Sequence, residues 1–269
     1  MLIEQTLYGT VNKVKIAIAR LRLHEPPEGY YLAFSGGKDS CVCYDLCRRA
    51  GVKFDAHYAV TTVDPPELVN FIRKEYPDAW EGRERPAMSM WELITHKGIL
   101  PTRKVRYCCQ VLKEGHGKGR MVITGIRAAE SPRRAKRAIM EACQTKRGKG
   151  FIHPIINWTT AEVWEYIKRY DISYCGLYDE SFKRLGCIGC PFASTEDRNR
   201  EFARWPKYKE FYLTAIRRMR EKRKKRGQKL ICSTAEEEFD WWLTGKTADY
   251  GHDENQTTLF GVVGDESML

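Results

Sequence analysis

The fold is decided by the stretch Tyr30-Tyr31-Leu32-Ala33-Phe34-Ser35-Gly36-Gly37-Lys38-Asp39-Ser40. A short apolar run ends at a pair of adjacent glycines, and residues 41–49 have the composition of a helix. This order predicts a buried strand, a glycine turn and a helix. Backbone N–H groups in such a turn lie at the positive end of the helix dipole, where phosphate binds. The stretch therefore predicts an anion site, with an ordinary Gly-Gly turn as the alternative.

Further along the chain, predicted strands continue to alternate with predicted helices. A second strand is expected over 54–63, and Pro65-Pro66 starts a helix that runs to Tyr76. A third strand is expected over 121–124, and the capping box of Thr159 and Glu162 opens a helix that runs to Tyr170. Such alternation predicts an α/β protein with a doubly wound parallel sheet.

The pattern divides the chain into three segments. Residues 1–27 contain a predicted N-terminal helix over 11–23, and residues 28–194 contain the alternating pattern. Residues 195–269 form a basic helical C-terminal extension and a tail, with apolar residues at helical spacing over 196–226 and a last short helix over 235–243.

Composition excludes several classes of protein. The chain has 269 residues, of which 42% are hydrophobic and 12% aromatic, so it can bury a sizeable core. No apolar run approaches the ~18 residues of a membrane-spanning helix, and the N-terminus has no signal-peptide pattern. We therefore expect a cytoplasmic protein with no membrane partner. In that compartment the 10 cysteines serve metal binding, catalysis or packing rather than disulfides.

Positive charge is concentrated in two segments. The formal net charge is +11, and residues 133–137 and 217–229 carry the densest runs, the second with nine Lys or Arg residues. Such runs suit a polyanionic partner, DNA or RNA, although a solvated helix face is the common alternative.

Several motifs in chain order carry a family resemblance. They are Ser35-Gly36-Gly37-Lys38-Asp39-Ser40, Asp64-Pro65-Pro66-Glu67, Thr124-Gly125-Ile126-Arg127 with Glu130-Ser131-Pro132-Arg133, His153-Pro154-Ile155, and Gly176-Leu177-Tyr178-Asp179. Together they resemble the phosphoadenylylsulfate reductase family and the related N-type ATP pyrophosphatases, whose pyrophosphate loop (PP-loop) has this form. The resemblance covers about residues 28 to 194 and implies the PP-loop fold.

The resemblance implies a site for an adenine nucleotide, either ATP or a sulfonucleotide. Lys38, Asp39 and Arg127 are the candidate catalytic residues, with Asp39 orienting Mg²⁺ and the two cations facing phosphate. A structural salt bridge is the alternative for Arg127, and a helix N-cap is the alternative for Asp64. The candidate nucleotide-binding residues are Ser35, Gly36, Gly37, Lys38, Asp39, Ser40, Asp64, Gly125 and Arg127.

The cysteine spacing indicates a metal centre. Cys108-Cys109 and the later pair Cys187 and Cys190 supply four thiolates, which suit zinc or an iron–sulfur cluster. Adjacent cysteines reach one Zn²⁺ awkwardly, and the pattern resembles the [4Fe–4S] ligand set of cluster-containing adenylylsulfate reductases and of DNA phosphorothioation ATP pyrophosphatases. Zinc and buried thiols without metal remain the alternatives. Candidates for a redox or sulfur-carrying thiol are Cys175 and Cys232.

The family resemblance, taken with these patterns, implies three alternative functions. The leading one is ATP-dependent adenylylation with release of pyrophosphate, coupled to sulfur transfer onto an acceptor such as nucleic acid, with a sulfur donor such as a cysteine desulfurase. The second is an adenylylsulfate or phosphoadenylylsulfate reductase that takes electrons from thioredoxin. It lacks the expected C-terminal nucleophile, because residues 233–269 contain no cysteine. The third is a non-catalytic module that binds nucleotide or nucleic acid. The sequence does not predict the oligomeric state.

Overall fold

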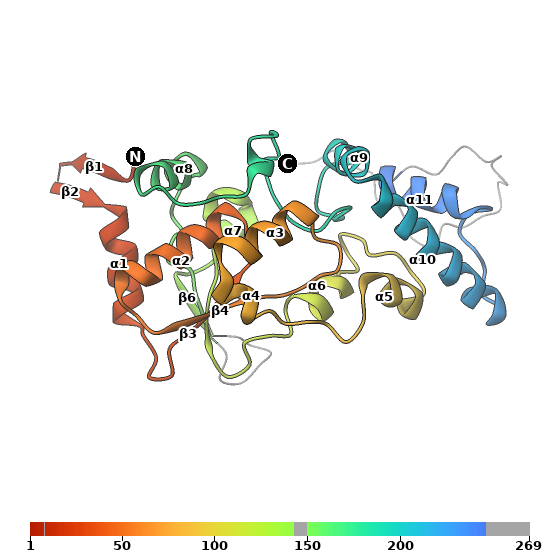
Figure 1. The fold of residues 1–269 in the computed structure, drawn as a ribbon, viewed down its shortest axis with the longest axis horizontal. Helices are drawn as coiled ribbons and strands as arrows, with labels where there is room; N and C mark the ends of the chain where they lie inside the picture. The colour runs from red at the N-terminus through yellow and green to blue at the C-terminus, as the bar shows by residue number, and fades with distance from the viewer. Residues whose placement is uncertain (8, 143–149, 246–269) are drawn as a thin grey trace, which may run out of the picture.

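A five-stranded sheet forms the centre of the computed structural model, which describes residues 1–7, 9–142 and 150–245 (Figure 1). The strands are β3 (Tyr30–Phe34), β4 (Phe54–Tyr58), β5 (Met121–Ile123), β6 (Met140–Ala142) and β7 (Gly150–Ile152), in the order β4-β3-β5-β7-β6. β4, β3, β5 and β7 are parallel, and β6 is antiparallel to β7 at one edge. In the register, Tyr31 of β3 lies opposite both Asp55 and Val122.

Helices cover both faces of this sheet. α2 (Lys38–Ala50) connects β3 to β4, and α3 (Pro66–Glu75), α4 (Pro77–Glu81), α5 (Met90–Lys97) and α6 (Tyr107–Leu112) connect β4 back across β3 to β5. Right-handed crossovers in opposite directions place the two connections on opposite faces. Four of the five residues of β3 are buried, as expected for a strand covered on both sides. The doubly wound α/β prediction is confirmed.

The N-terminal part packs against this unit. α1 (Lys13–Leu23) contacts α2, which in turn contacts α8 (Thr160–Arg169). The predicted capping box of Thr159 and Glu162 is formed. A hairpin of β1 (Ile3–Thr6) and β2 (Gly9–Asn12) precedes α1 and was not predicted. Short elements complete the unit, namely η1 (Ala128–Glu130), α7 (Pro132–Ala135) and η2 (Gly176–Tyr178).

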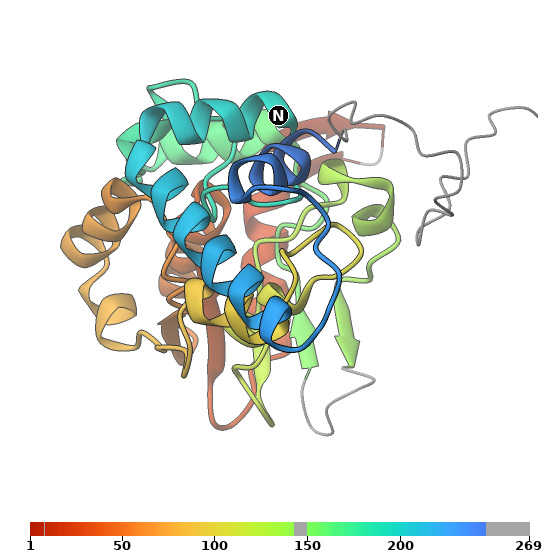
Figure 2. The same ribbon diagram turned by 90° about the vertical axis from the view of Figure 1, so that its right-hand side faces the viewer.

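The C-terminal helices share the hydrophobic core. α9 (Thr195–Arg204), α10 (Pro206–Lys225) and α11 (Ala235–Thr244) lie at the end of the molecule opposite the hairpin (Figure 1), and α10 crosses that end diagonally (Figure 2). The helical spacing over 196–226 is divided at Trp205, because Pro206 cannot continue α9. Buried Phe202 and Tyr212 belong to the same apolar cluster as Leu32 of β3. These helices therefore pack against the sheet unit in one core. The predicted domain boundary at residue 194 stays a prediction. Within the described ranges, no helix is long and apolar enough to cross a membrane.

Candidate active site

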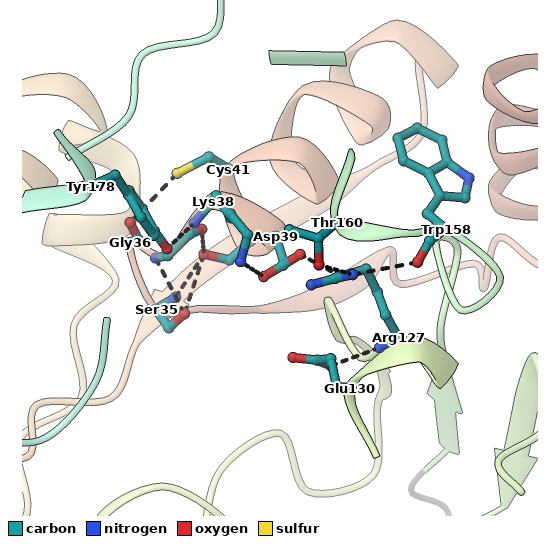
Figure 3. A network of polar contacts seen from close by, with 12 residues as sticks. Ser35, Gly36, Lys38, Asp39, Cys41, Arg127, Glu130, Trp158, Thr160 and Tyr178 are labelled. Carbon is teal, nitrogen blue, oxygen red and sulfur yellow. Dashed lines mark hydrogen bonds and ion pairs between the residues drawn. The ribbon is translucent and has the colours of Figure 1, made fainter. Parts of the chain in front are cut away.

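The glycine turn joins the carboxyl end of β3 to the N-terminus of α2 (Figure 3). Gly36 has a φ of 70°, and a Cβ at this position would lie 2.7 Å from Ile72, so the turn requires glycine there. The Ser40 hydroxyl donates to the Gly37 carbonyl at 2.8 Å, and the Ser35 backbone N–H donates to the Ser40 hydroxyl at 3.3 Å. These bonds fix the shape of the predicted phosphate loop.

The loop that follows β5 meets the start of α2. β3 and β5 are neighbours at the point where the strand order reverses, which is where open α/β sheets bind ligands. A Cβ on Gly125 would lie 3.0 Å from atoms of Asp39, so glycine permits this close approach. Two residues later, Arg127 Nε donates to Asp39 Oδ1 at 2.7 Å. Residues from two loops thus converge at the predicted nucleotide site.

Asp39 lies between two buried cations. Lys38 Nζ is 3.0 Å from Asp39 Oδ2, and the side chains of Lys38 and Arg127 are 7% and 3% exposed. Arg127 also donates through Nη1 to the Thr160 hydroxyl at 3.2 Å and to the Trp158 carbonyl at 3.4 Å (Figure 3). The salt-bridge alternative for Arg127 is therefore present in the structure. Two cations with one carboxylate leave a net positive charge, which favours an anionic ligand.

The hydroxyl of Tyr178 accepts a hydrogen bond from a backbone N–H of the phosphate loop. The backbone N–H of Lys38 donates to this hydroxyl at 3.0 Å, and Lys38 Nζ lies 5.6 Å from the centre of the Tyr178 ring. Burial raises the pKa of Tyr178, so the ring carries a neutral hydroxyl. The sequence motif contains Tyr178 but gives no sign of this bond, which joins positions 140 residues apart.

Asp64 does not cap α3, so the N-cap alternative is wrong. The N-cap residue is Pro65, and α3 has no side-chain capping hydrogen bond. The buried Asp64 carboxylate instead accepts from the Tyr58 hydroxyl at 2.6 Å and from the Thr61 backbone N–H at 3.2 Å. Burial raises the pKa of Cys187 most, and the negative charge of Asp64 raises this pKa further. Asp64 therefore faces the cysteine region.

The four candidate metal ligands come from two segments. Cys108 and Cys109 lie in the first turn of α6, and the turn that carries Cys187 and Cys190 follows η2. The Ile188 backbone N–H in this turn donates to the Val63 carbonyl at 2.8 Å, just beyond β4. Because β4 and β3 are parallel neighbours, the turn lies at the same edge of the sheet as the phosphate loop.

The four thiols influence one another electrostatically. A hydrogen bond to Cys109, followed by burial and the nearby Cys187 and Cys190, raises the pKa of Cys108. The same bond lowers the pKa of Cys109 to about 6, with Arg106 adding to the effect. All four thiols are free and half-buried. No group of three or more His, Cys, Asp or Glu side chains in the described part of the chain is arranged to hold a metal ion. Metal binding therefore stays a prediction.

The other two candidate cysteines lie apart from this group. Cys175 is buried and influences Cys41 beneath the phosphate loop, and burial raises the pKa of the Cys175 thiol. Cys232 lies in the connection between α10 and α11, where its carbonyl accepts from Arg220 at 2.8 Å. Burial raises the pKa of the Cys232 thiol as well. Neither thiol has the lowered pKa of an activated nucleophile.

Residues 29–193 match the Phosphoadenosine phosphosulfate reductase domain. The chain belongs to this family. The matched range contains the phosphate loop, Arg127 and the four cysteines, so the family resemblance is confirmed across the whole candidate site.

Similar proteins differ in length and in name. An uncharacterised protein of Methanocaldococcus jannaschii is 31% identical over 67% of this chain, and the alignment covers 44% of that relative. The adenosine 5′-phosphosulfate reductase of Shouchella clausii is 28% identical over 75% of this chain and 89% of its own length. The chain spans less than half of the first two relatives it matches. A solved phosphoadenylyl-sulfate reductase from Candida auris is 19% identical over 65% of this chain and 87% of its own, with a TM-score of 0.49.

Cations beside the cysteines were not predicted from the sequence. Desolvation lowers the pKa of Lys113, but the charges of Cys187, Asp64 and Cys190 outweigh it and raise this pKa overall. The buried Nε of Arg106 has no hydrogen-bond partner among the described residues. A buried donor of this kind requires an acceptor, and anionic sulfur provides one. Four thiols with cationic neighbours are the donor type that the predicted [4Fe–4S] group uses, and cluster binding itself stays a prediction. The position of Lys113, one helical turn after Cys109, is the signal that could have found it.

Each of the two basic segments contains both paired cations and exposed cations, the exposed ones in the first being Arg133 and Lys136. In the first, Arg134 pairs with Glu130, and Arg137 Nη2 lies 2.6 Å from Glu141. In the second, Arg220 is buried and bonds to Glu238 at 2.8 Å. The exposed cations of this segment are Arg217, which pairs with Glu236, and Arg218, Lys224, Lys225, Arg226 and Lys229.

Proposed function

We propose that this member of the family is an ATP pyrophosphatase that couples adenylylation to sulfur transfer. The observation that carries the proposal is the excess positive charge of Lys38 and Arg127 over Asp39 at the phosphate loop. It is supported by the position of the cysteine turn at the neighbouring strand end. An anionic polyphosphate is the ligand that such a loop accommodates.

In the proposed reaction, the loop binds the phosphates of ATP and the cations stabilise the charge that develops on them. An acceptor oxygen forms a bond to the α-phosphorus, and the bond to the bridging oxygen breaks as pyrophosphate leaves. A sulfur nucleophile at the oxidation level of sulfide then displaces AMP from the acceptor. A cysteine desulfurase is the donor class we propose, and a thiol reductant supplies the two electrons that convert its persulfide sulfur to sulfide.

Two resident groups belong to this proposal. Cys108, Cys109, Cys187 and Cys190 would bind the [4Fe–4S] cluster, which supplies a place to hold or deliver sulfur. Mg²⁺ is the ion expected with ATP. In the structure, both carboxylate oxygens of Asp39 accept from cations, which supports a counterion role for Asp39. In this arrangement neither oxygen of Asp39 is free to ligate Mg²⁺.

An adenylylsulfate or phosphoadenylylsulfate reductase is the second candidate. The relatives named adenosine 5′-phosphosulfate reductase favour it. This reaction requires a thiolate that attacks sulfur and a reductant such as thioredoxin. Cys232 would have to supply the thiolate from the α10–α11 connection, where burial raises its pKa. We therefore rank this reaction second.

A product assay distinguishes the candidates. The full chain, purified without oxygen and analysed for iron and sulfide, is incubated with ATP, with adenylylsulfate plus thioredoxin, or with phosphoadenylylsulfate plus thioredoxin. Pyrophosphate released from ATP supports the first function, and sulfite released from a sulfonucleotide supports the second. Nucleotide binding without either product would identify a non-catalytic module.

We further propose nucleic acid as the acceptor, because exposed cations gather at the end of α10. Phosphate backbones neutralise such clusters and release counterions, so affinity falls steeply as salt rises. Replacing Lys224 and Lys225 by Glu should weaken binding of a DNA or RNA duplex and flatten its salt dependence. Replacing exposed Lys15 and Lys168 by Glu changes the net charge equally on other surfaces. Equal losses in the two double variants would contradict a site on α10.

A further inference from the structure

Two residues of the sequence motifs, Thr124 and His153, have no part in the proposed reaction. Thr124 directly follows β5, and His153 directly follows β7, which is the parallel neighbour of β5. The Thr124 hydroxyl and His153 Nδ1 are 2.7 Å apart and share a hydrogen bond. A Cβ on the next residue, Gly125, would lie 3.0 Å from Asp39. The pair therefore borders the predicted nucleotide site.

The surroundings of His153 determine the direction of this bond. His153 is fully buried, and burial, followed by the positive charge of Arg137, lowers its pKa to about 4. The neutral ring has one nitrogen that donates and one that accepts. Arg137 Nη2 lies 3.5 Å from His153 Nε2, and a guanidinium only donates, so Nε2 is the accepting nitrogen. Nδ1 therefore carries the proton and donates to the hydroxyl oxygen of Thr124.

The proton of the Thr124 hydroxyl is consequently not used by His153. A hydroxyl has one donor and two acceptor positions, and here the oxygen already accepts from Nδ1. The described part of the chain supplies no acceptor for the Thr124 O–H, and the side chain is half-buried. The opposite tautomer of His153 would take this proton as its own acceptor. The observed arrangement instead leaves the hydroxyl available as a donor.

The two central strands are only partly covered beside this hydroxyl. Strands of a parallel sheet are usually buried on both faces, and Ala33 is the one residue of β3 that is not fully buried. Leu32 of β3 pairs with Ile123 of β5, so Ala33 and Thr124 occupy the next positions and share a face. Ligands bind at the carboxyl ends of such strands. Half-buried positions at the centre of the sheet thus indicate a surface that a ligand covers.

We propose that the Thr124 hydroxyl donates a hydrogen bond to the bound nucleotide, and that His153 and Arg137 are positioning residues that keep this proton available. Arg137 is itself held in place, because its Nε donates to Glu141 at 2.8 Å. The inference rests on the proposed nucleotide site and deepens it. It does not depend on pyrophosphate release or on the iron–sulfur cluster.

The test of the donor role is calorimetry of the full chain with ATP. Thr124→Val removes the hydroxyl at nearly constant volume, and we expect it to weaken ATP binding about 10-fold. Thr124→Ser restores the donor, so its ATP affinity should stay within about 3-fold of the unmodified chain. Thr95→Val is the matched control, because the Thr95 hydroxyl donates to the Trp91 carbonyl at 3.1 Å within α5. Its ATP affinity should not change.

The test of the positioning role is ¹⁵N NMR of the full chain labelled at histidine. The His153 signals, identified by their absence in His153→Asn, should show a protonated Nδ1 and an unprotonated Nε2. Arg137→Met removes the guanidinium and should give a mixture of the two tautomers. If half of the molecules carry the other tautomer, ATP affinity should fall about 2-fold, because only the competent fraction binds at full strength.

The outcomes separate this inference from the proposed reaction. ATP affinity that is unchanged in Thr124→Val, or lost equally in Thr95→Val, would overturn the donor role. A proton on Nε2 in the unmodified chain would overturn the positioning role. Should Thr124→Val fail to fold, Thr124→Ala decides, since water can then accept from Nδ1. An unmodified chain that binds no ATP would overturn both the nucleotide site and this inference. ATP binding without pyrophosphate release would contradict the proposed reaction alone.

Discussion

Replacing Asp39 by Asn tests whether this carboxylate serves as a counterion in the nucleotide-free protein. The substitution leaves Lys38 and Arg127 buried without their shared negative partner. Removing one partner of a buried ion pair costs about 3–5 kcal/mol. Asp39 is 20% exposed, so we expect the lower end, about 3 kcal/mol. For a chain of this size that corresponds to a fall in Tm of about 6–12 °C.

An added anion should reverse the loss. Pyrophosphate supplies the negative charge that the carboxylate provided, so it should bind Asp39→Asn about 10-fold more tightly or better than the unmodified chain in the presence of EDTA. If Asp39 instead ligates Mg²⁺, added Mg²⁺ will strengthen binding only in the unmodified chain. Thermal unfolding with and without pyrophosphate, and calorimetry with and without Mg²⁺, measure the two effects. In either case we expect pyrophosphate release from ATP to be lost and the visible absorbance of the cluster to remain.

Asp45→Asn is the control for this experiment. Asp45 lies on the same helix with a side chain that is 18% exposed, and it pairs with Arg49 at 2.6 Å. Arg49 is itself 38% exposed, so removing this pair costs only about 1 kcal/mol or less, and the amide oxygen of Asn can still accept the hydrogen bond that the Tyr166 hydroxyl donates to Asp45. The counterion argument is refuted if Asp39→Asn unfolds within about 2 °C of the unmodified chain, or if pyrophosphate does not bind it more tightly.

Three further predictions concern other parts of the site. Tyr178→Phe frees the Lys38 N–H, so it should destabilise the nucleotide-free chain by about 1 kcal/mol and tighten ATP binding several-fold in calorimetry; weaker binding would show that the hydroxyl serves the ligand. Cys109→Ser should abolish visible absorbance after reconstitution, and an unchanged spectrum refutes the ligand assignment. Burial raises the pKa of Glu162, but bonds from Lys13 and the Thr159 N–H outweigh it and give about 2. Stability from this group should be present above the usual value of 4.5 and lost as pH falls towards 2. Urea unfolding should therefore separate Glu162→Gln from the unmodified chain at neutral pH by about 2 kcal/mol, and much less at about pH 3.

Local patterns were sufficient for the elements that carry strong periodicity. The strand over 30–34 has the bounds expected from its apolar run, and the alternation of strands and helices predicted the parallel sheet. The β1–β2 hairpin was missed because exposed strands such as Ile3–Thr6 have little apolar alternation. β6 and β7 were missed because each has only three residues and lacks the continuous apolar run of β5: β6 contains Glu141 and β7 begins with Gly150.

The candidate site was predictable to the extent that single segments define it. The glycine turn and the cysteine pairs are contiguous in sequence, and Arg127 follows a strand end, so their chemistry could be inferred from residue type and spacing. The bond from Lys38 to Tyr178 and the bond from the Ile188 N–H to the Val63 carbonyl depend on tertiary packing between distant segments. No local rule relates such positions, and only the folded chain brings them together.

The C-terminal helices hold the backbone of the turn that carries Cys187 and Cys190, so the predicted cluster site depends on residues other than its four ligands. A Cys-x-x-Cys turn exposes backbone donors and acceptors that must be satisfied when the turn is half-buried. Here the Ile188 N–H is satisfied by the sheet unit, whereas the Ile188 carbonyl and the Gly189 N–H are satisfied by Tyr212 of α10 and Glu201 of α9. The turn is thus fixed from both sides, and the orientation of its thiols depends on helices outside the matched family range. Relatives that share residues 29–193 but differ beyond them would therefore hold the same cysteines in a different electrostatic setting.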